Sequence, residues 1–248
     1  MKLSGHKILL TGGSAGIGFE LAQALVSRNN QVAICGRDPQ KLAKARELLG
    51  DVITIQSDLA IASQIPKLAE EATQQLGGLS MLINNAGIQQ QINFIQTDTG
   101  HIAQAIANEI QINLTALMTL TAVCLPLLKK AKSAAVVNLS SALAITPKAS
   151  APVYCATKAA IHSFSQSLRY QMEDALPTVQ VFEVIPPLVD TQMTHGRGKG
   201  KISPQQVALE TLQGIERGQQ EIPIGKAKVL RSLHRLVPAL SAKILRNS

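Results

Sequence analysis

Short apolar segments alternate with longer amphipathic segments along most of the chain. Each short segment is rich in Val, Ile and Leu and ends in small or polar residues, which is typical of a strand buried on both faces of a parallel sheet. The longer segments repeat their apolar residues with the period of a helix. The pattern predicts strands at residues 7–11, 31–36, 52–56, 80–84, 134–140 and 179–185, and helices near 16–28, 39–49, 61–76, 101–131, 152–174 and 203–217.

This repeated strand–helix–strand order predicts a doubly wound α/β fold, with helices on both faces of a parallel, Rossmann-type sheet in three α/β/α layers. Residues 101–131 fit either two helices or one bent helix, and residues 221–224 fit a short edge strand. The chain has 248 residues and no linker, repeat or low-complexity tract, so we expect a single domain. Residues 1–225 form its body, and residues 226–248 form a basic amphipathic extension.

Composition narrows the class of protein. Hydrophobic residues make up 46% of the chain and aromatic residues only 2%, which predicts a substantial aliphatic core. The formal net charge is +8, but the six basic residues between Lys226 and Arg246 supply most of it. The rest of the chain is therefore not expected to bind nucleic acid.

Cysteine usage and the absence of targeting patterns indicate a cytoplasmic protein. Cys35, Cys124 and Cys155 lack paired spacing and predict reduced thiols, and we expect no metal site. The start of the chain lacks the pattern of a signal peptide, and no uninterrupted run of ~18 apolar residues predicts a membrane span.

Small, polar and glycine residues follow each predicted strand. In a doubly wound sheet, ligands bind beyond the carboxyl ends of the strands, so these residues are expected to share a site. They are Thr11-Gly12, Gly36-Arg37, Asp58-Leu59, Asn84-Asn85-Ala86-Gly87, Ser140-Ser141 and Pro186-Pro187.

The first of these strand ends leads into the pattern Gly12-x-x-x-Gly16-x-Gly18. Gly12 permits a tight turn, Gly16 lets the backbone approach a pyrophosphate, and Gly18 allows close packing of helix and strand. The turn therefore predicts a dinucleotide bound at a helix N-terminus, with a purely structural glycine turn as the alternative. Residues 12–16 also match the G-x-S-x-G elbow of α/β-hydrolases, but this elbow follows the first strand and has no late Asp–His pair.

A second motif, Tyr154-x-x-x-Lys158, puts a phenol and an ammonium one turn apart on a predicted helix. A nearby lysine favours the phenolate, and Pro152 fits a helix start, where the helix dipole also favours an anion. We therefore expect the pKa of Tyr154 to lie below its ordinary value of ~10, which suits proton transfer at neutral pH.

Together these motifs resemble the short-chain dehydrogenase/reductase family, in the branch whose chains are about as long as this one. The resemblance covers residues 5–225 and implies a nucleotide-binding and catalytic domain there. The residues that carry it are the turn Thr11–Gly18, Asp58-Leu59, Asn84-Asn85-Ala86-Gly87, Asn113, Ser141, Tyr154 and Lys158.

The resemblance implies an NAD(P)-dependent oxidoreductase in which Tyr154 exchanges a proton with the oxygen of a carbonyl or an alcohol. Ser141, or alternatively Ser140, would hold that oxygen. Lys158 would lower the pKa of Tyr154 and hold the nicotinamide ribose, and Asn113 would position a water that joins Lys158 to solvent. The hydride would come from the nicotinamide.

Cofactor contacts and assembly also follow from the resemblance. A small-molecule substrate is implied, as is a homodimer or homotetramer whose interface uses the helices near 105–131 and 152–174. The implied cofactor contacts are Gly12, Ser14, Gly16, Ile17, Gly18, Arg37, Asp58, Leu59, Asn85, Ala86, Gly87, Tyr154, Lys158, Pro186, Val189 and Thr191.

Cofactor preference depends on the end of the second strand. Gly36 occupies the position where NAD-specific proteins carry an acid, and Arg37 suits the 2′-phosphate of NADP(H), which is therefore predicted. Asp38 keeps NAD(H) as the alternative. The sequence departs from the family after the sixth strand, where Pro187 replaces the usual glycine ahead of Thr191.

Two basic segments allow two interpretations each. The glycine-rich loop 190–202 either attracts an anionic substrate through His195, Arg197, Lys199 and Lys201, or is a solvated mobile loop. The tail 226–248 either packs on its own domain or a sister subunit, or lies on an anionic membrane as a basic amphipathic helix. The tail also resembles that of a bacterial subgroup associated with D-alanylation of lipoteichoic acid, which does not set the substrate.

The sequence thus predicts an NADP-dependent enzyme acting on CH–OH or C=O groups. The alternative is a nucleotide-binding sensor or scaffold that keeps the fold and has little turnover.

Overall fold

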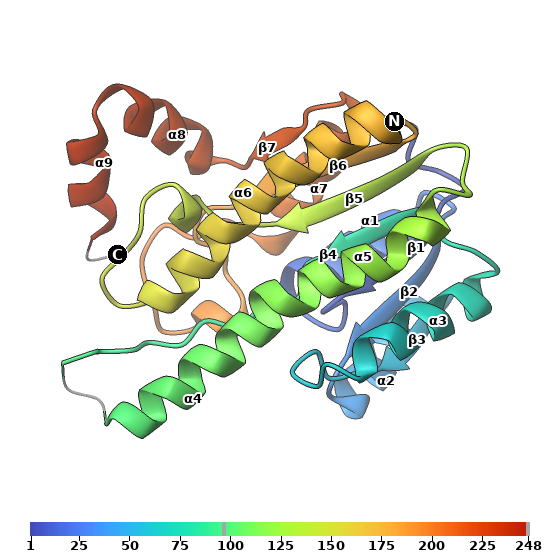
Figure 1. Ribbon diagram of the computed structural model, residues 1–248, viewed down its shortest axis with the longest axis horizontal. Helices are drawn as coiled ribbons and strands as arrows, with labels where there is room; N and C mark the ends of the chain where they lie inside the picture. Colours follow the sequence, from blue (N-terminus) through green and yellow to red (C-terminus); the bar gives the residue numbers. More distant parts are fainter. Residues whose placement is uncertain (96–97, 247–248) are drawn as a thin grey trace.

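A computed structural model describes residues 1–95 and 98–246, and within them a parallel sheet of seven strands carries the fold (Figure 1). The strand order is β3-β2-β1-β4-β5-β6-β7, and every neighbouring pair is parallel. The predicted doubly wound α/β fold is confirmed. The strands are β1 (Lys7–Thr11), β2 (Gln31–Gly36), β3 (Val52–Gln56), β4 (Met81–Asn84), β5 (Ala134–Leu139), β6 (Val179–Ile185) and β7 (Glu221–Pro223).

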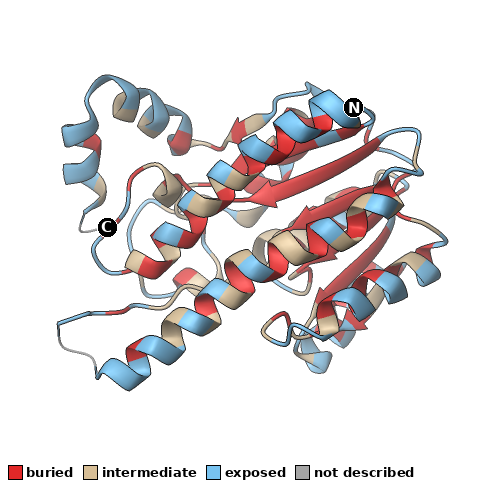
Figure 2. Ribbon diagram, in the orientation of Figure 1, coloured by how far each residue is buried: buried red, intermediate tan, exposed pale blue. Residues whose placement is uncertain are grey.

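Helices cover both faces of this sheet. The first face packs against α1 (Gly16–Val26), α2 (Pro39–Leu49) and α7 (Pro204–Glu216). The second face packs against α3 (Gln64–Leu76), α5 (Ala116–Leu128) and α6 (Pro152–Ala175). The strands are therefore buried on both sides, as their continuous apolar runs predict (Figure 2).

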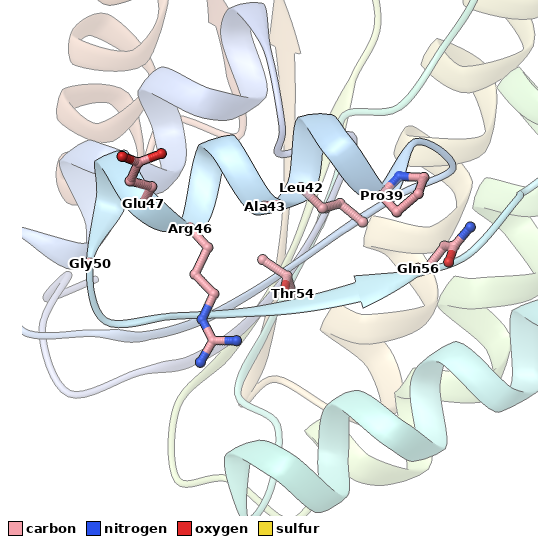
Figure 3. A pocket seen from close by; sticks show the side chains of 8 residues that line it. All are labelled: Pro39, Leu42, Ala43, Arg46, Glu47, Gly50, Thr54 and Gln56. Atoms are coloured by element: carbon pink, nitrogen blue, oxygen red, sulfur yellow. The ribbon is translucent and has the colours of Figure 1, made fainter.

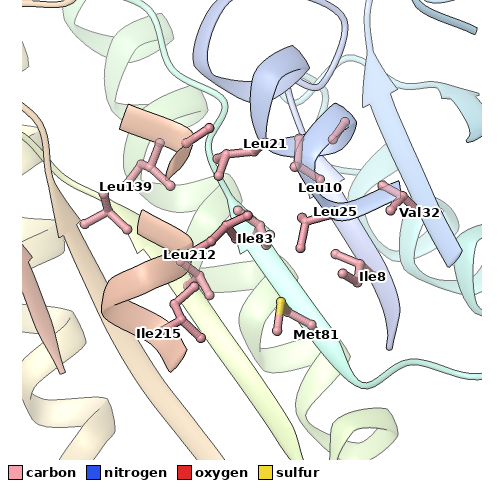
Figure 4. Packing of buried hydrophobic residues seen from close by; sticks show 14 of the residues in the cluster. Ile8, Leu10, Leu21, Leu25, Val32, Met81, Ile83, Leu139, Leu212 and Ile215 are labelled. Atoms are coloured by element: carbon pink, nitrogen blue, oxygen red, sulfur yellow. The ribbon is translucent and has the colours of Figure 1, made fainter. Parts of the chain in front are cut away.

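Aliphatic side chains fill the core between the sheet and its helices, as the scarcity of aromatic residues predicts. Ile8 and Leu10 of β1 pack with Leu21 and Leu25 of α1 and with Leu212 of α7 (Figure 4). All five are fully buried. Each such side chain contributes about 1.5–3 kcal/mol when it is transferred from water into this layer.

One continuous helical segment, Thr99–Leu128, resolves the ambiguity of residues 101–131. It consists of α4 (Thr99–Ile110), a π-helical turn (Gln111–Thr115) and α5. By length and composition it is the one helix among the described residues that could cross a membrane. In this structure the α5 part packs on the sheet with a buried apolar side, which accounts for its composition.

The C-terminal tail forms two helices, α8 (Lys226–Leu236) and α9 (Pro238–Leu245), instead of one amphipathic helix. The break falls at Val237, because the following proline begins a new helix. Ala149 donates its backbone N–H to the carbonyl of Arg246 at 2.9 Å, so the tail contacts its own domain. Most of the remaining tail surface is exposed (Figure 2), and contact with a sister subunit or a membrane stays a prediction.

A buried polar network ties the second face of the sheet to its helices near the carboxyl ends of the strands. Asn84 at the end of β4 donates to Asn138 of β5 at 2.9 Å and to Thr121 of α5 at 3.1 Å. Asn138 in turn donates to the hydroxyl of Ser165 on α6 at 3.0 Å. Because all four groups lie out of water, each depends on its protein partners.

We expect Asn138→Ala to lower the free energy of unfolding by about 1–3 kcal/mol, because it removes partners from two buried polar groups. Equilibrium urea denaturation measures this loss. Gln104→Ala on the exposed side of α4 is the matched control, with an expected change within about 0.5 kcal/mol. Superimposable curves for the two variants would show that the network does not stabilise the fold.

Candidate active site

The glycine turn joins β1 to α1 and is fixed to the end of β4. Gly12 and Gly16 have positive φ values of 67° and 55°, which side-chain-bearing residues rarely adopt. A Cβ atom on Gly18 would collide with the carbonyl oxygen of Gly12, so helix and turn could not approach as they do. No side chain caps the N-terminus of α1 at Ala15, which leaves the first helical N–H groups available to a ligand.

The turn borders a pocket of about 610 Å³ at the carboxyl edge of the sheet. The pocket lies where the strand order reverses, since β1 has β2 on one side and β4 on the other. The predicted site residues that line it are Gly12, Ser14, Gly16, Ile17, Gly18, Arg37, Asp58, Leu59, Asn85, Ala86, Gly87, Tyr154, Lys158, Pro186 and Thr191.

Three predicted site residues are not part of this lining. Val189 is 4% exposed and packs in the hydrophobic core, which places its side chain away from the pocket. Ser141 and Asn113 are buried beside the lining and act on it through neighbours, as described below.

A second hollow, of about 530 Å³, lies between α2 and β3 at the edge of the sheet (Figure 3). Leu42, Arg46, Thr54 and Gln56 line it, and none of the predicted site residues does. The chemistry suggested by the sequence is therefore concentrated in the first pocket.

Tyr154 lies in the first turn of α6, which begins at Pro152. The ammonium of Lys158 lies 5.6 Å from the centre of the Tyr154 ring. Burial raises the pKa of Tyr154 to about 12, although a hydrogen bond with Ser141 acts in the opposite direction. The phenol is therefore protonated at neutral pH in this structure.

This result differs from the expectation that Lys158 lowers the pKa of Tyr154. The Lys158 ammonium donates instead to the backbone carbonyl of Leu139 at 2.7 Å. Burial lowers the pKa of Lys158 itself to about 8, against the opposing charges of Glu109 and Glu183. Tyr154 and Lys158 lie one helical turn apart, as predicted. For the pKa of Tyr154, however, the desolvation of the phenol has a larger effect than the nearby lysine.

Asn113 lies in the π-helical turn and connects three elements. Its amide nitrogen donates to the carbonyl of Ile88 at 2.9 Å and to the hydroxyl of Thr157 at 3.2 Å. Its oxygen accepts the N–H of Ile88 at 2.8 Å. A Cβ on Gly87 would lie 3.3 Å from that oxygen and 3.7 Å from the ammonium of Lys158, so this glycine keeps the space between them open.

The two adjacent serines after β5 have different partners. Ser140 donates to the buried carboxylate of Glu183, which also binds His162 at 2.7 Å. Ser141 accepts the N–H of Leu143 at 3.1 Å and is hydrogen-bonded to Tyr154. Ser140 therefore helps to link the sheet to α6 through Glu183 and His162, whereas the hydroxyl of Ser141 is hydrogen-bonded to the phenol of Tyr154.

At the far end of the pocket, Asp38 caps α2 by accepting the N–H groups of Gln40 at 3.0 Å and Lys41 at 3.2 Å. Arg37 and Lys41 line the pocket beside it. Lys41 was not predicted as a site residue, because only the fold brings the first turn of α2 to the pocket. Arg37 and Lys41 thus bring two cations to this end, where the carboxylates of Asp38 and Asp58 also line the pocket.

The pocket offers features that fit a dinucleotide. The hydroxyl of Ser57 lines the pocket but is buried and has no hydrogen-bond partner. A Cβ on Gly36 would lie 3.3 Å from the hydroxyl of Ser14, so a larger residue would narrow this end. These residues and the free N–H groups of α1 would hold the adenosine and pyrophosphate parts of a nicotinamide dinucleotide.

In the basic loop 190–202, Arg197 is the basic residue that reaches the pocket, which Thr191, Gln192 and Met193 also line. Arg197 lines it and donates to the amide oxygen of Gln89 at 3.0 Å. Lys201 instead pairs with Asp190 at 3.2 Å, and His195 and Lys199 are exposed. The four basic residues of the loop therefore occupy different environments.

Glu109 is a buried carboxyl group that the sequence analysis did not identify. It is fully buried, and one of its oxygens has no hydrogen-bond partner. Burial raises its pKa to about 7, while Gln90 and the charge of Lys158 act in the opposite direction. The sequence does hold one signal for such a group: Glu109 is an acidic residue in an otherwise apolar predicted helix, four residues before Asn113.

Replacement of this carboxyl should change how stability depends on pH. Between the ordinary pKa of a glutamate and about 7, the folded protein holds a proton that the unfolded chain releases, so Glu109 lowers stability as the pH rises through that window. We expect Glu109→Gln to gain thermal stability relative to the wild type as the pH is raised from about 5 to about 8.

Melting temperatures of both proteins across this range test the expectation. The exposed Glu47→Gln is the control for loss of a surface carboxylate. A difference between Glu109→Gln and wild type that is constant with pH would contradict a titrating Glu109.

Comparisons with known proteins agree with this geometry. A family model described as short chain dehydrogenase matches residues 6–201. The uncharacterized oxidoreductase DltE of Bacillus subtilis is 41% identical over 241 residues, covering 95% of this chain and 94% of that protein. The ketoacyl reductase HetN of Nostoc is 29% identical over 249 residues, covering 96% of this chain and 85% of that protein.

Solved structures show the same fold. A short chain dehydrogenase from Burkholderia cenocepacia in complex with NADP has a TM-score of 0.85 and 25% identity, covering 99% of both chains. A short chain dehydrogenase/reductase from Burkholderia phymatum in complex with NAD also has a TM-score of 0.85, at 20% identity, covering 100% of this chain and 97% of that one. The match of residues 6–201 and the identity to DltE show that the chain belongs to the short-chain dehydrogenase/reductase family of oxidoreductases.

Proposed function

We propose that the protein is an NADP(H)-dependent carbonyl reductase, able to oxidise the corresponding alcohol, with Tyr154 as the proton donor and acceptor. The observation that carries this proposal is the hydrogen bond of Tyr154 with Ser141 beside Lys158, at the pocket bordered by the glycine turn. A proton donor, an oxygen-binding hydroxyl and a dinucleotide site in one pocket are what hydride transfer to a carbonyl requires.

Tyr154 is suited to the reductive direction. Its pKa of about 12 keeps the phenol protonated, and an alkoxide formed on the substrate is a stronger base than a phenolate. The hydroxyl of Ser141 would stabilise the negative charge that develops on the same oxygen. The nicotinamide supplies the hydride when it is bound.

Lys158 and Asn113 make hydrogen bonds that hold their surroundings at this site in place. Lys158 donates to the carbonyl of Leu139, which holds its ammonium beside the phenol. Its pKa of about 8 allows it to release and regain a proton near neutral pH. The amide of Asn113 fixes the backbone of Ile88 at the pocket wall. These contacts support an orienting role for both side chains.

Two cationic side chains at one end of the pocket support NADP(H) as the cofactor. Arg37 and Lys41 line the end where the 2′-phosphate would lie, while the carboxylate of Asp38 is engaged by two N–H groups of α2. Cations next to a glycine-containing strand end suit a phosphate better than a ribose hydroxyl. The structural relatives include an NADP complex and an NAD complex.

A cytoplasmic homodimer or homotetramer with an interface on the α4–α5 and α6 helices completes the proposal. Ile110 on α4 and Tyr170 on α6 are large apolar side chains exposed on those helices.

A sensor or scaffold with the same fold is less well supported, because Tyr154, Ser141 and Lys158 are brought together at the pocket.

We expect Arg37→Ala to raise the Kd for NADPH about tenfold or more and to leave the Kd for NADH unchanged, because only NADPH carries the 2′-phosphate. Titration of nucleotide fluorescence with each variant measures both constants. Arg46→Ala, an exposed change on α2 outside this pocket, is the control. Equal effects of Arg37→Ala on both nucleotides would reject the assignment.

We expect Tyr154→Phe to reduce kcat for carbonyl reduction by about 10²–10⁴-fold while NADPH still binds, because the ring remains and only the proton donor is lost. Turnover of a carbonyl panel with NADPH gives kcat, and fluorescence titration gives the Kd. Tyr170→Phe changes the other tyrosine of the chain and serves as the control. Wild-type protein that binds NADPH but reduces nothing would favour the scaffold alternative.

A further inference from the structure

A buried glutamate joins the wall of the pocket to the surface of the protein. Glu183 of β6 is 1% exposed, and one of its oxygens accepts the hydroxyl of Ser140, which lines the pocket, at 2.5 Å. Its other oxygen lies 2.7 Å from Nδ1 of His162 on α6, whose side chain is 38% exposed. The three side chains therefore form one hydrogen-bonded path from the pocket to solvent.

The serine at the inner end of this path lies between two residues that contact the catalytic pair proposed above. The carbonyl of Leu139, one residue before Ser140, accepts the ammonium of Lys158 at 2.7 Å. Ser141, one residue after it, is hydrogen-bonded to Tyr154. A displacement of Ser140 would therefore disturb the ammonium and the phenol together.

Charged groups from two further elements surround the outer end of the path. Glu221 of β7 is the register partner of Glu183, so the two glutamates lie side by side on neighbouring strands. Arg231 of α8 forms an ion pair with Glu221, and His162 forms one with Glu183 when its ring is protonated. Of these two cations, only the imidazolium can lose its charge near neutral pH.

The charge at the outer end of the path therefore depends on pH. The hydrogen bond with Glu183 raises the pKa of His162 above its ordinary value of 6.5, while the charges of Glu221 and Arg231 act on it in opposite directions. As the pH rises through this raised pKa, the ion pair is lost and Glu183 keeps an uncompensated charge in a buried position. The charge of Glu183 also acts on Lys158, one turn before His162 on α6.

We propose that His162 is a pH-sensitive positioning residue of this active site, which acts through Glu183 and Ser140. In its protonated form, His162 compensates the charge of the carboxylate that fixes Ser140. The segment around Ser140 then orients Tyr154 and Lys158 for reduction. In the neutral form of His162, the buried charge is uncompensated and this orientation is weakened. The inference rests on the proposed carbonyl reductase function.

The pH dependence of turnover tests this role. We expect His162→Gln, which removes the charge and keeps an N–H donor, to reduce kcat for carbonyl reduction about 10-fold at about pH 6. The ratio of wild-type to variant kcat should fall toward one as the pH is raised to about 9, because the wild-type imidazole then loses its proton. A ratio near one at every pH, or a loss that does not change with pH, would overturn the proposal.

His101→Gln is the matched control, because His101 also pairs with a carboxylate, that of Asp98, but 87% of its side chain is exposed. It should leave the ratio near one at every pH. Glu183→Gln is a second test variant, since its amide oxygen can still accept from Ser140 while the charge is lost. It should remove the same pH dependence, and a profile identical to that of the wild type would contradict the role of Glu183. Fluorescence titration with NADPH shows that each variant is folded.

An NMR titration of the histidine rings needs no turnover. The signals of His162 are assigned by their absence from His162→Gln, and they should titrate at a higher pH in the wild type than in Glu183→Gln. The same midpoint in both proteins would overturn the ion pair on which the proposal depends. Wild-type protein that reduces carbonyls with a constant kcat ratio keeps the reductase function and loses this inference. Wild-type protein that binds NADPH and reduces nothing refutes both.

Discussion

The position of the whole site depends on a polar lock between the ends of β1 and β4. The hydroxyl of Thr11 accepts the N–H groups of Asn85 and Ala86, both at 3.0 Å. The amide of Asn85 returns two hydrogen bonds, to the carbonyls of Thr11 and Gly12, at 2.9 and 3.1 Å. β1 and β4 lie at the reversal of strand order, so this lock sets the shape of the crevice between them. The glycine turn and the Gly87 segment are both held by it.

Buried charged groups next to the pocket are the second constraint on the structure of the site. Lys158 is held by the carbonyl of Leu139, Glu183 by Ser140 and His162, and Glu109 by one weak backbone contact. Each of these groups would be more easily solvated at the surface. Burial of the phenol itself raises the pKa of Tyr154, and burial of Lys158 and Glu109 moves the pKa of each toward neutrality. The site therefore keeps the phenol of Tyr154 protonated at neutral pH.

The fold could be predicted from the sequence because its determinants are local. Runs such as Ile8-Leu9-Leu10 have the pattern of a doubly buried strand, and the structure places a strand there. Pairs separated by four residues, such as Tyr154 and Lys158, could also be predicted to lie close together. The pKa of Tyr154 could not be predicted, because a pairwise argument along a helix does not include the desolvation imposed by the rest of the fold.

The residues that sequence reasoning missed are those whose partners lie far away along the chain. Lys41 reaches the pocket only because α2 begins beside the end of β2, and Glu109 meets the N–H of Gln90 only through the fold. Val189, which the resemblance places at the cofactor, packs its side chain in the hydrophobic core and does not line the pocket.

The tail has a structural role that its composition did not suggest. The hydroxyl of Thr146 lies 3.2 Å from His234 of α8 and 3.5 Å from Ser241 of α9, and Arg246 accepts the N–H of Ala149. These contacts fix the loop between β5 and α6, which leads into the helix that carries Tyr154. In a fold whose cofactor edge is fixed by β1 and β4, changes in such late segments can alter substrate preference without disturbing the dinucleotide site.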